Sequence, residues 1–120
     1  MEIGYRKLKA RQKADELAYK IYQETKKFPK EELFGIISQI RRSALSVPLN
    51  IVEGMGRQNK KELRNFANIA LGSLAETEYL LDFCVRLEYI DKQVYADLEA
   101  VRSETGRLLW SFHKNLSAQS

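Results

Sequence analysis

The chain has 120 residues, of which 44% are hydrophobic and 30% are charged, and its net charge is +4. This length suits one domain with a single core, and six glycines and two prolines argue against a turn-rich all-β fold. No signal peptide follows the basic N-terminus, and no run reaches the roughly 20 apolar residues of a membrane span. Cys84 is the only cysteine, which fits a reducing compartment. We therefore expect one cytoplasmic domain over residues 1–120, with no membrane association.

The first predicted helix covers about residues 10–27. Apolar and small side chains recur there at intervals of three and four, which is one face of a helix. These residues are Ala14, Leu17, Ala18, Ile21 and Thr25. Phe28-Pro29 ends the helix, because proline disfavours helical geometry in the residue before it.

The second predicted helix covers about residues 30–54 and carries two apolar faces. The face expected in the core contains Leu33, Ile36, Ile37, Ile40, Ala44, Val47 and Ile51. The second face contains Phe34, Leu45, Leu49 and Val52. A face of this kind on the outside of a domain predicts contact with another subunit.

Small and polar residues run between these two faces and allow a neighbouring helix to approach closely. They are Gln39, Ser43, Ser46, Asn50, Glu53 and Arg57. Pro48 predicts a kink in the later half of the helix, since it cannot donate to the carbonyl of Ala44. Gly54 and Gly56 predict the end of the helix, where a left-handed backbone is common.

The third and fourth predicted helices cover about residues 60–88 and 92–116. Asn59 with Glu62 resembles a capping box at the start of the third helix, and Asp91 is the expected cap of the fourth. Four amphipathic helices on short connections predict an all-α fold, an antiparallel up-down-up-down four-helix bundle. A coiled-coil rod is the weaker alternative, because the breaks divide the chain evenly.

Catalytic and metal-binding groups are sparse. Cys84 falls in line with core positions, where a free cysteine acts as a small hydrophobe. The only histidine, His113, lies near the end of the fourth helix, where a surface role at the helix dipole is expected. The sequence has none of the Glu-x-x-His pairs of di-iron bundles. We expect no enzymatic activity, no cofactor and no metal.

Glu76 lies within an apolar stripe of the third helix and is expected to have a cationic partner. Arg41 or Arg42 of the second helix is the natural candidate, in the same subunit or in a neighbour. The predicted role of this ion pair is structural, because it would fix how the helices align.

Four segments resemble one known family. They are KFPKEELFG (27–35), SQIRRSALSVPLNIVEGMGR (38–57), NKKELRNF (59–66) and LGSLAETEYLL (71–81). Together they are similar to the four-helix bundle proteins called 23S ribosomal RNA intervening-sequence proteins, with a likeness over about residues 5–115. Leu49 and Met55 depart from the family pattern, and both lie on or near the expected outer surface.

The resemblance implies a bacterial four-helix protein that assembles as a homopentamer. A similar pentamer is an accessory protein of diversity-generating retroelements, where it is associated with a reverse transcriptase and nucleic acid. By this analogy the partners expected for the chain are itself, RNA or DNA, and a protein such as a reverse transcriptase.

Two functions remain open from the sequence. The first is a nucleic-acid or ribonucleoprotein accessory module, whose candidate phosphate contacts are Arg41, Arg42, Arg57, Lys60, Lys61 and Arg64. Residues 1–30 add positive electrostatic potential to this surface, because they contain nine Lys/Arg against four Asp/Glu. The second is a structural homo-oligomeric scaffold that binds a protein partner. For the uneven charge itself, a solvated first helix with ordinary lysines is the favoured explanation.

Overall fold

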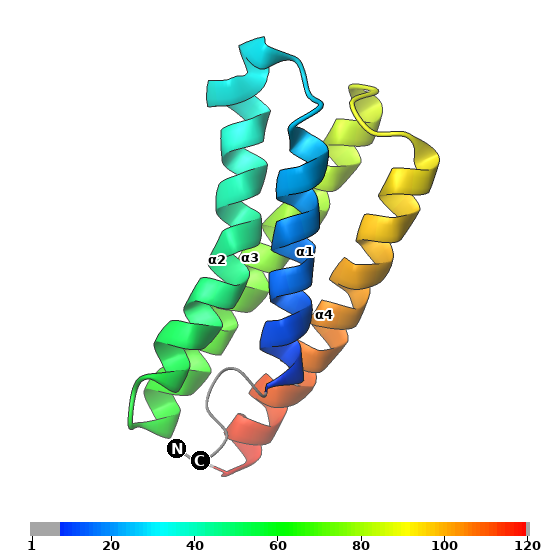
Figure 1. Ribbon diagram of the computed structural model, residues 1–120. Helices are drawn as coiled ribbons and strands as arrows, with labels where there is room; N and C mark the ends of the chain where they lie inside the picture. Colours follow the sequence, from blue (N-terminus) through cyan, green and yellow to red (C-terminus); the bar gives the residue numbers. More distant parts are fainter. Residues whose placement is uncertain (1–7, 120) are drawn as a thin grey trace.

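The computed structural model describes residues 8–119, and for residues 117–119 only the backbone. Four long helices make up this part of the chain: α1 (Lys9–Thr25), α2 (Ser38–Met55), α3 (Lys60–Arg86) and α4 (Lys92–Gln119). Each helix packs against the next, and α4 packs back against α1 (Figure 1). The predicted all-α four-helix bundle is confirmed. The α2–α3 turn lies at the same end of the bundle as the start of α1 and the end of α4 (Figure 1).

The core consists of the side chains that the helical periodicity places inward. Every residue of the predicted core face of α1 is buried, from Ala14 to Thr25, and Phe28 closes this face. In α2 the buried residues include Ile40, Ala44, Val47 and Ile51. Burial of these apolar surfaces is the main stabilising contribution to the bundle.

The predicted second helix, 30–54, is not continuous. A 3-10 turn (Lys30–Glu32) and a π-helical segment (Leu33–Ile37) precede α2, and Gly35 leaves helical geometry at φ −106° and ψ −117°. Glu32 stabilises this break, because its carboxylate accepts a hydrogen bond from the Ile36 amide. A Cβ on residue 35 would lie 2.6 Å from Glu32 Oε1 and would displace this carboxylate from its place beside the Ile36 amide.

The break at Gly35 changes which side chains reach the core. Leu33 was expected to be buried, but it is 48% exposed, and its neighbour Phe34 is 93% exposed. A straight helix would have kept Leu33 in register with Ile37 and Ile40, which are buried. The prediction for Leu33 was wrong because the periodicity does not continue across a non-helical residue.

α2 ends at Met55 with Gly56 as its C-cap residue, as the two glycines predicted. The helix continues through Pro48, which is buried, and the kink expected there stays a prediction. Gly56 keeps a right-handed backbone (φ −76°), so it does not form a left-handed cap. Gly54 is required for packing instead, because a Cβ there would lie 2.8 Å from Cβ of Phe66 on α3.

The starts of α3 and α4 follow the predicted caps. Asn59 Oδ1 accepts hydrogen bonds from the amides of Lys61 (2.8 Å) and Glu62 (3.2 Å), which satisfies donors that a helix start leaves open. Asp91 Oδ1 accepts a bond from the Val94 amide at 2.8 Å. α4 continues to Gln119, three residues beyond the predicted end.

Over the described residues, none of the helices combines the length and the apolar character that crossing a bilayer requires.

Candidate nucleic-acid interface and outer stripe of α2

The turn between α2 and α3 brings together four of the six basic residues expected to contact phosphate. Arg57, Lys60 and Lys61 are exposed and Arg64 is partly buried. We refer to these four residues as the basic turn. The cap by Asn59 starts α3 immediately after the turn, and so Lys60 and Lys61 stand in the first turn of this helix, where the positive end of the helix dipole favours anions.

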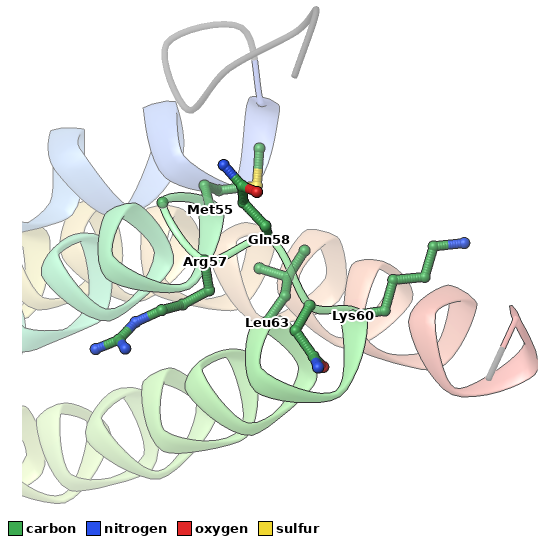
Figure 2. A pocket seen from close by; sticks show the side chains of 7 residues that line it. Met55, Arg57, Gln58, Lys60 and Leu63 are labelled. Atoms are coloured by element: carbon green, nitrogen blue, oxygen red, sulfur yellow. The ribbon is translucent and has the colours of Figure 1, made fainter.

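A shallow pocket of about 510 Å³ lies at this turn, and it includes Met55, Arg57, Lys60 and Leu63 in its lining. Figure 2 shows that the Arg57 and Lys60 side chains extend from it in different directions. Their charges therefore do not converge on one point inside the pocket. Such a spread of positive charge suits an extended polyanion better than a small anionic ligand.

Arg57 is held in place by contacts on its own surface. Its Nη2 donates to Glu53 Oε2 at 2.9 Å, and its guanidinium lies 5.2 Å from the centre of the Phe66 ring. Both partners of the ion pair remain exposed to water, so the pair contributes little to stability. The contact with the Phe66 ring nevertheless orients the guanidinium at the surface.

The remaining two arginines do not belong to the basic turn. Arg41 Nε donates to Thr25 Oγ1 at 2.8 Å, and its guanidinium lies 4.7 Å from the centre of the Tyr22 ring. Arg41 therefore joins α2 to α1. Arg42 is exposed but precedes Arg57 by fifteen residues, or roughly 22 Å along the helix. The six residues predicted as one set thus fall into three places.

Glu76 is exposed on the outer side of α3. Among the ion pairs of the described residues, none joins Glu76 to Arg41 or Arg42. Glu76 therefore does not form the predicted ion pair with an arginine of its own chain, because Arg41 turns toward α1 and Arg42 points outward. Pairing of Glu76 with an arginine of a neighbouring subunit stays a prediction.

The small and polar seam of α2 packs against α3 of the same chain. The hydroxyls of Ser46 and Ser73 lie 2.9 Å apart, and Thr77 Oγ1 donates to Ser43 Oγ at 2.9 Å. Asn50 Nδ2 extends this network by donating to Ser46 Oγ at 2.9 Å. With Gly54 at the end of the same contact, the two helices approach closely along most of α2. The close neighbour expected from the seam is thus intramolecular.

The second apolar face of α2 has no such neighbour among residues 8–116. Phe34 is 93%, Leu49 57% and Leu45 39% exposed, and Val52 is partly buried. We call these four residues the outer stripe of α2. Their exposure is that expected of a surface available for assembly, although the contact itself stays a prediction.

The two groups with nucleophilic or basic character lie far apart. Cys84 is buried near the end of α3, and desolvation raises the pKa of its thiol to about 11. His113 lies 21 residues into α4, roughly 30 Å along that helix from the α3–α4 turn. They therefore do not form a Cys-His pair. Within residues 8–119, no three His, Cys, Asp or Glu residues are grouped as a metal site would need.

These features define a small basic four-helix bundle with an uncovered apolar stripe and a basic turn. The model of the 23S rRNA-intervening sequence protein family matches residues 6–111, and the chain belongs to this family. It is similar to the crystal structure of a protein with unknown function from the S23 ribosomal protein family of Bacteroides thetaiotaomicron VPI-5482. The two share 34% sequence identity and a TM-score of 0.81, over 88% of this chain and 95% of that one. No curated protein matches the chain.

Proposed function

We propose that this protein is a non-enzymatic, self-assembling bundle that binds nucleic-acid phosphates through its basic turn. The observation that carries the proposal is the grouping of Arg57, Lys60, Lys61 and Arg64 at one end of the bundle, around the start of α3. Contacts of this kind neutralise phosphates without reading bases, so binding is weakly selective for sequence.

Self-assembly is the second part of the proposal. The outer stripe of α2 is a contiguous apolar surface on a small protein, and covering it in an oligomer removes it from water. The homopentamer implied by the family resemblance is the assembly we propose. Each added copy brings a further net charge of +4, which strengthens the field around the assembly.

RNA is the first nucleic acid to test. The family takes its name from 23S ribosomal RNA, and the similar crystal structure is that of an S23 ribosomal protein family member. These names concern the family and the relative, and they guide the choice of probe for this chain. Structured RNA and duplex DNA of equal length form the two arms of the test.

The experiment is a mobility-shift titration at several salt concentrations. Lys60→Glu/Lys61→Glu should weaken binding and make it less dependent on salt. The slope of the logarithm of the binding constant against the logarithm of the salt concentration should be smaller in magnitude by roughly 0.7–0.9 for each phosphate that is no longer neutralised. The matched control is Lys26→Glu/Lys92→Glu, which makes the same change in net charge at the other end of the bundle. Arg102 is unsuitable as a control, because it bridges Glu99 and Glu78.

Equal effects of the two double variants, or no binding even at low salt, would refute the role of the basic turn. The second candidate function, a scaffold for a protein partner such as a reverse transcriptase, would then lead. Two exposed aromatic side chains outside the stripe, Tyr19 and Trp110, favour that candidate, because aromatic residues are enriched where proteins meet.

A further inference from the structure

The π-helical segment before α2 presents one aromatic side chain almost completely to water. Phe34 is the most exposed of the large hydrophobic residues in the described chain, at 93%. Phe34 directly precedes the break at Gly35. The Glu32 carboxylate supports this conformation, because it accepts hydrogen bonds from the Ile36 amide and from the Tyr89 hydroxyl. Covering a phenylalanine held in this way removes a large apolar side chain from water, which is favourable.

A groove on the other flank of the same segment lacks an occupant. It has a volume of about 310 Å³ and is lined by Gly35, Ile36, Gln39, Tyr79, Leu80 and Phe83. We call it the α3 groove. A cavity of about 150 Å³ is enough for a benzene ring, so the groove has room for a phenyl side chain. Its aromatic wall, Tyr79 and Phe83 with ring centroids 6.2 Å apart, suits an edge-to-face contact with a third ring.

Phe34 cannot fill the groove of its own chain. It lines a different hollow together with Tyr22 of α1, whereas the α3 groove faces α3. The projecting ring and the groove are thus two different patches on opposite flanks. Contacts between different patches are heterologous, and they close into rings or extend into filaments.

We propose that Phe34 of one copy inserts into the α3 groove of the next copy, head to tail around a ring. This inference rests on the proposed self-assembly and specifies the contact that forms it. The outer stripe alone does not fix this geometry, because an apolar stripe fits a twofold dimer equally well.

Charge complementarity indicates that the α3 groove is occupied by a second copy of the chain, whose helices run in the same direction as those of the first. Arg42 is exposed and lines the same hollow as Phe34. Glu76 is exposed one turn before Leu80, which lines the groove. Since α2 and α3 are antiparallel, both charges lie on the same side of the contact. Arg42 is about 6 Å along α2 from Ser38, which also lines the hollow of Phe34, and Glu76 is about 6 Å along α3 from Leu80.

The apolar residues beyond this pair keep the same alignment. Leu45 follows Phe34 by eleven residues, and Ile69 precedes Leu80 by eleven residues. Both are exposed, Ile69 at 51%. Two copies in the same direction therefore bring Leu45 of one toward Ile69 of the next, on the same side of the contact as Arg42 and Glu76, and an opposite orientation would break both of these pairings.

The first test measures assembly of the full chain by light scattering and sedimentation over a range of concentrations. Phe34→Ala should raise the concentration of half-dissociation about 10- to 100-fold, because it removes a large apolar contact. Tyr19→Ala removes another exposed aromatic side chain and should leave assembly unchanged. Circular dichroism should show native helix content for both, since neither side chain is in the core.

The second test uses the direction of the contact. Tyr79→Glu places a charge in the groove but leaves Phe34 intact, and Phe34→Ala does the reverse. Each variant alone should fail to form rings. An equimolar mixture should stop at a one-to-one heterodimer, because only one of its two contacts is competent. Absence of this heterodimer would overturn the inference.

The third test exchanges the charges. Arg42→Glu and Glu76→Arg should each weaken assembly about tenfold, and the double variant should restore it. If the wild-type protein is a monomer, the proposed self-assembly fails as well. If it assembles and Leu45→Asp dissociates it, but Phe34→Ala has no effect, only this inference is overturned.

Discussion

The close approach of α2 and α3 depends on Gly54, and its replacement tests how the bundle is packed. A Cβ at this position would lie 2.8 Å from Cβ of Phe66 and 3.0 Å from Cδ1 of Leu63. Carbon atoms pack at about 3.5–4.0 Å, so the two helices would have to separate by roughly 1 Å. The Cβ of Phe66 is fixed to the backbone and cannot move aside alone. Gly54→Ala should therefore strain the helix contact.

Gly72 provides the matched control, because it is an exposed glycine within α3 and an added Cβ would meet no atom within 4 Å. Alanine in place of glycine stabilises a helix by up to about 1 kcal/mol, and this gain is common to both sites. Overpacking at Gly54 costs about 1–3 kcal/mol. Gly72→Ala should raise the free energy of unfolding. The free energy of unfolding of Gly54→Ala should be about 1–3 kcal/mol lower than that of Gly72→Ala.

Urea denaturation followed by circular dichroism measures this difference, at two protein concentrations so that assembly is recognised. In thermal unfolding the two variants should differ by about 4 °C per kcal/mol. If both substitutions raise stability by the same amount, the helices accept a methyl group at Gly54. The argument for close packing would then be wrong.

Two further outcomes follow from the contacts of single side chains. Arg41→Gln should lower the free energy of unfolding by about 1 kcal/mol without affecting nucleic-acid binding, because it removes the hydrogen bond to Thr25. Arg42→Gln should leave the free energy of unfolding of the monomer unchanged. Denaturation measures the stability of both variants, and mobility-shift titration measures their binding. The pKa of the Cys84 thiol is raised to about 11, so native protein at pH 8 should react slowly with a disulfide reagent and denatured protein rapidly. The unfolded thiol ionises first as the pH rises, so stability should fall from about pH 9 to 11, and less in Cys84→Ala. Fast labelling of native protein, or equal losses in both proteins, would contradict the burial of this thiol.

The sequence predicts the helices well wherever local chemistry decides their position. The Asn59 and Asp91 caps form as expected, because each requires only a side chain two or three residues from an open amide. The core face of α1 is likewise a property of periodicity alone. The error at Leu33 has a different origin, since Gly35 reads as a tolerable helix residue in sequence. Its break is stabilised by Glu32, which is held in turn by Tyr89 from the distant α3–α4 turn.

The candidate site was harder to predict, because side-chain partners come from other helices. Arg41 and Arg42 are adjacent in sequence and look equivalent there. In the structure one is committed to Thr25 and Tyr22 of α1, and the other points into water. The one signal available was the polar Thr25 within the apolar stripe of α1, which needs a hydrogen-bond partner once buried. Gly54 likewise gave no sign that Phe66 would lie against it.

The direction of the proposed subunit contact links assembly to nucleic-acid binding. The Arg42–Glu76 pairing and the Leu45–Ile69 alignment both require neighbouring copies to lie in the same direction. Every basic turn would then be at the same end of the ring, because the α2–α3 turn lies at one end of each bundle (Figure 1). The repeated Lys60 and Lys61 would form a rim with several phosphate contacts, and several weak contacts on one polyanion act together. Copies in mixed directions would divide the same lysines between two ends and lower the positive charge at each.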